Sequence, residues 1–441
     1  MTNQRQTNAG ASLARIAVNR FDALSVLGWA ILGAVLCWNL TGRIDPRIIS
    51  GQPKTCNAFD VWFEADSPRV FDNMTTRYTG TDDDRSIIHP FFSLLTMPAV
   101  RILQVTLRLR APIAVRVYQA AVCAAWSALL YALLRCVGCG IVDACLLESI
   151  ALVSAAGLFW FAVPETWPLS SLAVLFGLLV YVVQEHKPLS DRWHVGAQLA
   201  CAGVTLTNAM VPLFGALTTL NRKRALRLAL VSVTLFGLMF GVEKFLFRKE
   251  TLGLPQYVDS YVFTRAAGGP AAVARAFFFH TVVMPQPQLI RREDPGWKFS
   301  IQASALGSGG KTAGVATLVW AVLLTLGLFE ARRLSARSAF HVVLLCGLLG
   351  QFSLSLVYGN ETFLYAINFL PFLLLTAAAA FRMRHRWVAR ALGVLLLCLM
   401  LPHNGRAFAR TVQQFTSVLD KNSELETRHW LSHHPHASPA S

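Results

Sequence analysis

The sequence predicts an all-α polytopic membrane protein, a bundle of about 11 transmembrane helices that forms one integral membrane domain over residues 1–441. Of the 441 residues, 54% are hydrophobic and 15% are charged, whereas a soluble domain carries about 25% charged residues. Apolar stretches recur along the chain, and stretches of roughly 20 such residues span a bilayer. No Pro-, Gly- or Ser-rich linker of domain-separating length interrupts them.

The formal net charge of +16 has a membrane explanation. Lys and Arg gather between the apolar segments, as they do at the cytoplasmic ends of membrane helices, and they attract anionic lipid. We therefore predict the lipid bilayer as a partner and no nucleic acid.

The positive-inside rule gives the order of crossings. A cytoplasmic tail at 1–21 leads into a signal anchor, and the basic turns then fall on the cytoplasmic side. The other side receives a first outer loop at 41–113 and a second outer loop at 247–312. A C-terminal tail at 403–441 follows the last span. The predicted apolar segments are 22–40, 114–134, 141–163, 166–184, 195–219, 225–246, 313–330, 339–358, 362–381 and 388–402.

The segment 195–219 has two interpretations. As one crossing, it places the basic run 221–227 and all later basic clusters outside. As a helical hairpin that bends near Asn208 and Pro212, it returns them to the cytoplasmic side. We favour the hairpin, because broken helices are tolerated in membranes where they line a cavity.

This layout places the candidate chemistry on one side of the membrane. The cytoplasmic side has short basic turns, whereas acids, His and Arg cluster in the outer loops. We predict a bacterial cytoplasmic membrane protein whose active site faces the periplasm or exterior.

The first outer loop contains the stretch FEADSPRVFDNM, which begins at Phe63. Acids and Arg69 alternate there with apolar residues, which indicates an amphipathic segment lying along the membrane surface. A carboxylate held there is partly desolvated, and its raised proton affinity suits a general base. Asp66 is the first candidate for this role. The alternative is that Asp66 caps a helix with Pro68 at an early position.

A second amphipathic stretch is expected over 89–107. It begins with a His-Pro pair at His89, and Arg101 lies among its apolar residues. We predict a surface helix rather than a crossing. Arginines on the outer side are not explained by topology, and their planar guanidinium groups suit phosphate binding.

These features together resemble the GT-C superfamily of membrane glycosyltransferases. The features are the acid after the first span, the His-Pro element and the Arg-led second span (VRVYQ, from Val115). Within this superfamily, the sequence most resembles the protein mannosyltransferase and aminoarabinose transferase type. The resemblance implies a GT-C-like bundle with amphipathic juxtamembrane helices. It also implies transfer of a sugar from a polyprenyl-phosphate donor to a glycan, lipid or protein acceptor, as in the synthesis of a cell-envelope glycan.

The resemblance also implies roles for single residues. The catalytic base maps to Asp66, with Glu64 or Asp60 as the alternatives, and the His of the His-Pro element maps to His89. Members of the superfamily are typically inverting, and the carrier phosphate needs positive charge. The residues that would bind it are Arg69, Arg85 and Arg116.

No cofactor is required for this chemistry, because arginines can stabilise the departing phosphate. A divalent cation, Mg or Mn, remains an alternative, and the run Asp82–Asp84 is either a solvated turn or a weak cation site. We predict no built metal site. Cys136 and Cys139 have CxxC spacing, but no second pair accompanies them.

Other outer segments supply candidate cavity residues. Glu165 in PETW and Glu361 in GNETFLY each precede an apolar segment, so each either contacts sugar hydroxyls or stabilises a helix N-terminus. The second outer loop contains AAVARAFFFHTVVMPQP, which we expect to lie amphipathically on the outer surface and cover a lipid chain. The predicted cavity residues are Glu165, Asn208, Arg265, His280 and Glu361.

Two other functions stay open. A membrane transporter or lipid flippase should carry ionisable groups in mid-span and internal repeats, and the sequence shows few of the former and none of the latter. The other open function is that of a non-catalytic membrane assembly protein.

Overall fold

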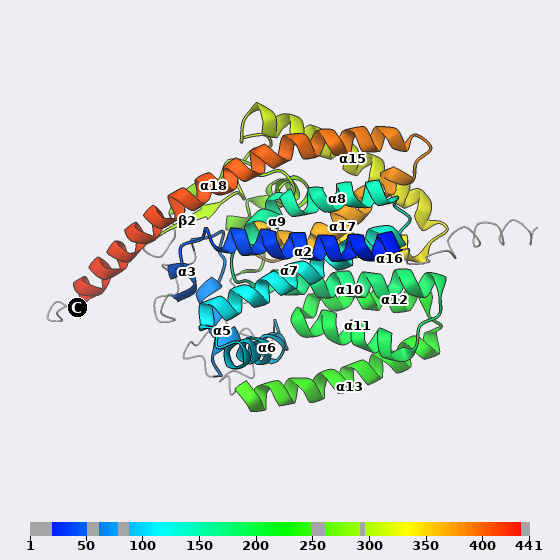
Figure 1. The fold of residues 1–441 in the computed structure, drawn as a ribbon, viewed down its shortest axis with the longest axis horizontal. Coiled ribbons are helices and arrows are strands. Elements are labelled where there is room, and N and C mark those ends of the chain that lie inside the picture. Colours follow the sequence, from blue (N-terminus) through cyan, green and yellow to red (C-terminus); the bar gives the residue numbers. More distant parts are fainter. Residues whose placement is uncertain (1–19, 51–60, 78–87, 248–260, 292–295, 434–441) are drawn as a thin grey trace, which may run out of the picture.

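The computed structural model describes residues 20–50, 61–77, 88–247, 261–291 and 296–433 (Figure 1). Within these ranges the chain is an all-α polytopic bundle with one antiparallel pair of short strands. Eight helices of the described chain are long and apolar enough to cross a membrane, so the predicted count of about 11 is not confirmed. They are α2 (Arg20–Thr41), α7 (Ala111–Cys136), α10 (Thr166–His186), α13 (Arg222–Phe247), α15 (Lys311–Ser335), α16 (Ala339–Val357), α17 (Ala366–Ala378) with its flanking 3-10 turns η6 (Thr362–Tyr365) and η7 (Ala379–Arg382), and α18 (Arg386–His433).

Shorter elements complete the described chain. The predicted segment 141–163 is broken at Ser154, whose hydroxyl caps the second piece by accepting the Gly157 N–H at 3.0 Å. The shorter elements are α3 (Arg47–Ser50), α5 (Ser67–Thr75), α6 (Phe92–Thr106), α8 (Ile141–Val153), α9 (Ala155–Trp160), α11 (Asp191–Val204), η2 (Leu206–Ala209), α12 (Met210–Thr219), η4 (Arg265–Ala267), α14 (Gly269–Arg275), the π-helical turn η5 (Ala276–His280), β1 (Gln288–Arg291) and β2 (Trp297–Ser300).

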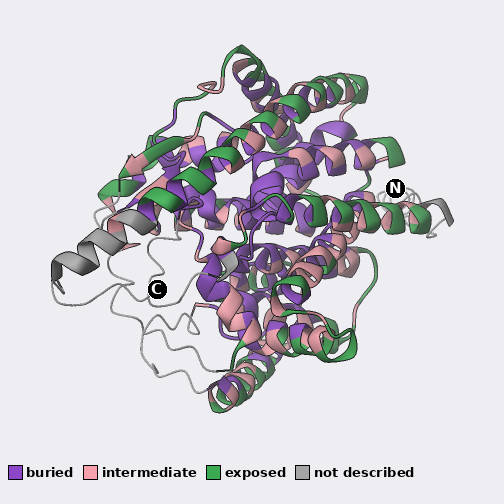
Figure 2. Cartoon of the chain, turned by 60° about the vertical axis from the view of Figure 1, so that its left-hand side comes forward, coloured by how far each residue is buried: buried purple, intermediate pink, exposed green. Residues whose placement is uncertain are grey.

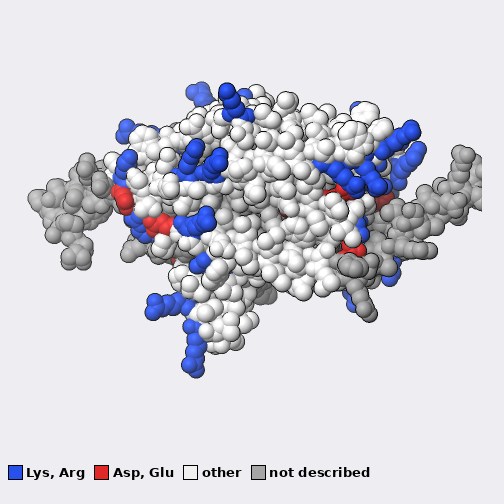
Figure 3. Space-filling model, turned by 45° about the horizontal axis from the view of Figure 1, so that its top comes forward, with Lys and Arg blue, Asp and Glu red and all other residues white. Residues whose placement is uncertain are grey.

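The bundle has two ends that hold different structural elements, named here the basic end and the loop end. The basic end holds the turns at 137–140, 187–190, 220–221, 336–338 and 383–385, and the loop end holds α3, α5, α6 and the two strands (Figure 1). Figure 3 shows Lys and Arg gathered toward both ends of the long axis, with a mostly uncharged surface between them. This is the pattern expected of a protein whose middle lies in lipid.

The segment 191–219 is a helical hairpin, as favoured from the sequence. Arg224 at the start of α13 donates from Nε to Asp191 Oδ1 at 2.9 Å, so the beginning of α11 and the end of α12 lie at the same end of the bundle. The bend is η2. The basic run after it therefore stays at the basic end.

The core lies around α17, whose residues are all buried, and Figure 2 shows buried residues through the middle of the bundle. In contrast α2 and α13 are peripheral, and α13 exposes large apolar side chains such as Leu230 and Val233. Exposed apolar side chains on a polytopic helix suit contact with lipid acyl chains.

The first loop packs two amphipathic helices against the loop end. Helix α6 has 15 residues, and Figure 1 shows it at a steep angle to the long bundle helices, in agreement with a surface helix. The N–H of Phe91 donates to Gly203 O at 2.7 Å, so the His-Pro segment is tied to the hairpin bend.

One expectation about the later loops was wrong. The segment after Arg275 is buried rather than lying on the surface: Phe277 stacks on Phe369 with ring centroids 4.0 Å apart. The first part of the predicted tail, residues 403–433, is helical, since α18 continues through Pro402. Phe408 and Phe415 of this part pack on the buried ring of Trp62.

Candidate active site

Four of the residues singled out from the sequence line one pocket at the loop end of the bundle. They come from the start of α5, from the His-Pro segment and from the turn before α10, and Trp167 forms a wall beside them. The pocket encloses about 20 Å³, which is room for a single water molecule. The four are Asp66, Arg69, His89 and Glu165.

Asp66 occupies the N-cap position of α5, as the helix-start alternative expected, with Pro68 in the first turn. Its side chain makes no capping hydrogen bond to the helix and forms an ion pair with Arg69 instead. The side chains of Asp66 and Arg69 are 13% and 8% exposed, so the pair is largely shielded from water.

Glu165 holds the starts of two helices together. Its Oε1 accepts the backbone N–H of Asp66 at 3.2 Å, and its Oε2 accepts the N–H of Thr166. Burial raises the pKa of Glu165 to about 7, and the neighbouring Asp66 carboxylate adds to the rise. Glu165 therefore changes charge near neutral pH, directly beside Asp66.

The tautomer of His89 is set by its surroundings. Its Nδ1 lies 2.9 Å from the carbonyl oxygen of Val204, which is an acceptor only, so Nδ1 carries the proton. Thr205 Oγ1 lies 3.2 Å from the same nitrogen. In the neutral ring the lone pair is therefore on Nε2, and the edge-to-face contact with Trp167 fixes the ring plane.

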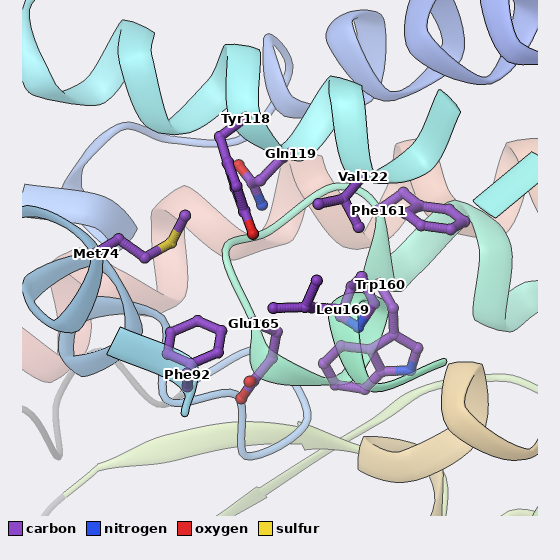
Figure 4. Close-up of a pocket in the computed structure, with 10 residues that line it drawn as sticks. Met74, Phe92, Tyr118, Gln119, Val122, Trp160, Phe161, Glu165 and Leu169 are labelled. Atoms are coloured by element: carbon purple, nitrogen blue, oxygen red, sulfur yellow. The ribbon is translucent and has the colours of Figure 1, made fainter. Parts of the chain in front are cut away.

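A second small pocket lies on the other side of Glu165 (Figure 4). Phe92 and Glu165 line both pockets, and Figure 4 shows the Tyr118 hydroxyl pointing from α7 into the second one. Gln119 contributes an amide to the same wall. Tyr118 and Gln119 belong to the VRVYQ run, but the sequence analysis predicted a role only for Arg116 of that run.

Arg116 does not line either pocket. Its guanidinium group binds the end of α2, where Nε donates to Thr41 Oγ1 at 2.8 Å and Nη2 donates to Trp38 O. The group also lies over the Trp38 ring, 3.8 Å from the centroid. Arg116 therefore ties α7 to α2, and the structure does not bring it to the predicted phosphate site.

Glu64 and Glu361 lie in a separate cluster near β2. Glu64 forms an ion pair with Lys298, and both Phe63 and Glu64 have positive φ angles, of 52° and 63°. Ser300 donates from Oγ to Glu361 Oε2 at 2.5 Å. Burial raises the pKa of Glu361 to about 8, although the Ser300 hydrogen bond opposes the rise.

The other predicted cavity residues are not brought to the pocket. Asn208 is fully buried, and its amide bonds to Ser170, Gln351 and Asn368. His280 is also buried, and burial followed by nearby Arg275 lowers its pKa to about 4. Arg265 is exposed in η4. Arg85, Asp60 and Asp82–Asp84 lie outside the described residues.

No metal centre is present among the described residues, where no three His, Cys, Asp or Glu side chains gather closely enough to hold an ion. The positive charge at the pocket comes from the Arg69 guanidinium group. The dependence on Mg or Mn stays a prediction.

An apolar groove approaches the site between α11, α12 and α13. Its volume is about 640 Å³, and its lining includes Leu213 and Phe236. Leu206 lines this groove and also a cavity that reaches Trp167. A lipid-facing groove therefore adjoins the neighbourhood of the pocket.

Comparisons with protein-family models, with curated proteins and with solved structures each find no match to this chain. The GT-C resemblance is therefore a hypothesis about function rather than a family assignment.

Proposed function

We propose that the chain is an inverting membrane glycosyltransferase of the GT-C type. It moves a sugar from a polyprenyl-phosphate donor to a glycan, lipid or protein acceptor. The observation that carries the proposal is the meeting of Asp66, Arg69, His89 and Glu165 in one shielded pocket beside amphipathic surface helices. A carboxylate next to a cation is what phosphate displacement from a sugar requires.

Asp66 is the general base in this scheme. It takes the proton of the acceptor hydroxyl while that oxygen bonds to the anomeric carbon, and the bond from this carbon to the phosphate oxygen breaks. The phosphate leaves with the electron pair, toward Arg69. Because Arg69 pairs with Asp66, an arriving phosphate competes for the guanidinium group and frees the carboxylate to act.

Glu165 and His89 support this pair. Glu165 positions Asp66 through its backbone, and when ionised it makes the neighbouring carboxylate a stronger base. His89 is held by Val204 through Nδ1–H, so its neutral ring offers Nε2 as an acceptor to a bound hydroxyl. Arg69 supplies the positive charge, so the proposed reaction needs no cofactor.

The apolar groove favours a lipid-linked donor. It lies between helices that are apolar enough to face lipid, and Leu206 connects it to the cavity behind Trp167. An isoprenoid tail in this groove would deliver its phosphate to the loop end. The positive-inside rule supports the same direction, because it assigns the basic end to the cytoplasm and the loop end to the periplasm or exterior.

A transporter or lipid flippase is the second candidate, and one observation favours it. Glu148 of α8 is fully buried, and among the described residues neither of its carboxylate oxygens has a partner within hydrogen-bonding geometry. Ionisable groups inside a membrane bundle often mark ion or proton pathways.

Reconstituted vesicles distinguish the two candidates. The purified protein is given polyprenyl-phosphate hexoses and pentoses, with and without EDTA, and both sugar transfer and movement of intact donor across the bilayer are measured. We expect labelled sugar to leave the donor for an acceptor, at the same rate with EDTA. Movement of intact donor without cleavage of its sugar bond would support the flippase instead.

A further inference from the structure

A larger cavity adjoins the pocket on the far side of Trp167. Its volume is about 180 Å³, whereas the pocket that holds Asp66 encloses about 20 Å³. Drug-sized ligands occupy roughly 300–1,000 Å³, so this cavity suits something smaller, such as one ring. Trp167 lines both spaces, and His89 packs edge-to-face on it with centroids 5.2 Å apart.

The walls combine aromatic rings with amides. Trp167 meets Tyr365 edge-to-face on its other side, with centroids 4.6 Å apart, and Tyr358 stands next to Tyr365. Aromatic side chains of this kind present an apolar face together with a polar tip. A sugar ring has the matching surface, with C–H groups on its faces and hydroxyls around its edge.

One wall residue has an unused acceptor. Gln351 is 3% exposed, and its Nε2 donates to Asn208 Oδ1 at 2.9 Å. Its Oε1 makes no hydrogen bond with the described residues, although Gln351 lines the cavity. A ligand hydroxyl could donate to this oxygen, whereas a lipid chain could not.

The cavity wall is also connected to His89 through hydrogen bonds. Thr205 Oγ1 lies 2.7 Å from Ser170 Oγ, and Ser170 Oγ donates to Asn368 Oδ1 at 2.9 Å. Thr205 and Asn368 line the cavity, and Thr205 also contacts His89. Walls held in this way lose little freedom when a ligand enters.

We propose that this cavity is a carbohydrate subsite. It takes one pyranose or furanose ring, with the aromatic walls against the ring face and the Gln351 amide oxygen accepting a hydroxyl. The inference rests on the proposed function for its biological meaning, since the ring belongs either to the donor or to the acceptor.

The first test needs no knowledge of the reaction. The protein in lipid nanodiscs is heated with methyl glycosides of glucose, mannose, galactose and arabinose, and thermal unfolding is recorded. We expect at least one glycoside to stabilise the wild type, because a ligand of the folded state raises its unfolding temperature. Asp66→Asn should keep this stabilisation. In Gln351→Leu, which loses one hydrogen bond, the glycoside should bind about tenfold more weakly.

A second variant, which fills the cavity, keeps the test valid if Gln351→Leu misfolds. Thr207 is exposed, and its side chain makes no hydrogen bond with the described residues, so Thr207→Trp should fill the cavity without harming the fold. Thr234→Trp on the exposed face of α13 is the matched control. Thr207→Trp should abolish glycoside stabilisation and Thr234→Trp should keep it. No stabilisation by any glycoside, or stabilisation that survives Thr207→Trp, overturns the subsite.

Kinetics then identify the source of the ring. An increase of about tenfold or more in the donor KM of Thr207→Trp assigns the ring to the donor, and the same increase in the acceptor KM assigns it to the acceptor. If both KM values are unchanged while transfer proceeds, the subsite is wrong and the glycosyltransferase stands. If no donor is used but glycosides bind and Thr207→Trp prevents it, the subsite stands and the glycosyltransferase fails.

Discussion

The Oε1 atom of Glu165 accepts the backbone N–H of Asp66 at 3.2 Å, joining two residues that are 99 positions apart. This contact fixes the start of α5 against the start of α10. It also places an acid with a pKa of about 7 beside the proposed base. The pocket therefore depends on the fold of the bundle and not on the first loop alone.

The pH dependence of transfer should report Glu165. Burial and the Asp66 carboxylate raise its pKa from 4.5 to about 7, so it is neutral below that pH and ionised above it. Because ionised Glu165 strengthens the base, kcat/KM should rise as pH increases through 7. In Glu165→Gln this inflection should vanish and the rate should stay near the low-pH value. A preserved inflection in the variant would assign it to another group.

Two arginines should separate binding from folding. Arg69→Ala should raise the donor KM by roughly 10–100-fold, since it removes a charge-assisted contact to phosphate, and Arg69→Lys should restore part of it. Arg116→Ala should lower the unfolding temperature, because Arg116 binds Thr41 and Trp38, and should leave the donor KM within about twofold. Donor titrations and thermal unfolding of both variants check this. Equal effects of the two on donor KM would contradict the assignment.

Stability should fall as pH rises, because of Glu361. Burial raises its folded-state pKa from 4.5 to about 8, so the folded state holds a proton that the unfolded chain has already released between these values. The linked loss of unfolding free energy is up to about 5 kcal/mol at about 1.4 kcal/mol per unit. Thermal unfolding from pH 5 to 9 should show the decline in the wild type and a smaller one in Glu361→Gln. Glu165 has a raised pKa of the same sign, so part of the slope below pH 7 should remain.

The second half of α18 should be necessary for the fold. Asn404 is fully buried; its Oδ1 accepts the Met284 N–H at 2.9 Å and its Nδ2 donates to Val282 O at 2.8 Å. Asn404→Ala should cost about 3 kcal/mol, because it leaves buried backbone groups without partners. The exposed Asn39 bonds only within its own helix, so Asn39→Ala should cost under about 1 kcal/mol. Denaturation of both variants in detergent measures the difference.

Much of the layout could be predicted because it follows from local rules. The sign of the charged turns favoured a hairpin at 195–219, and the Asp191–Arg224 pair agrees with it. The amphipathic pattern at 89–107 indicated a helix, and the 15-residue α6 forms there. Acids, Arg and His on one side of the membrane also pointed to Asp66, Arg69, His89 and Glu165, which share a pocket.

The features that the sequence did not predict depend on tertiary contacts, which a local sequence pattern does not indicate. The last apolar segment was predicted to end at residue 402, but α18 continues, and Phe408 and Phe415 of the continuation pack on Trp62. The apolar run after Arg275 resembled a surface helix, yet Phe277 packs on Phe369 in the core. Arg116 looked like a phosphate ligand until the position of Thr41 and Trp38 was known.

The most direct measurement compares two aspartates of α5. Asp66 lines the pocket, whereas Asp72 is partly buried on the same helix and lines neither this pocket nor the one beside it. In single-turnover assays with the donor already bound, Asp66→Asn should slow sugar transfer by about 10²–10⁴-fold, the usual contribution of a general base. Asp72→Asn should transfer at nearly the wild-type rate. Transfer by Asp66→Asn at the wild-type rate would contradict the proposed mechanism.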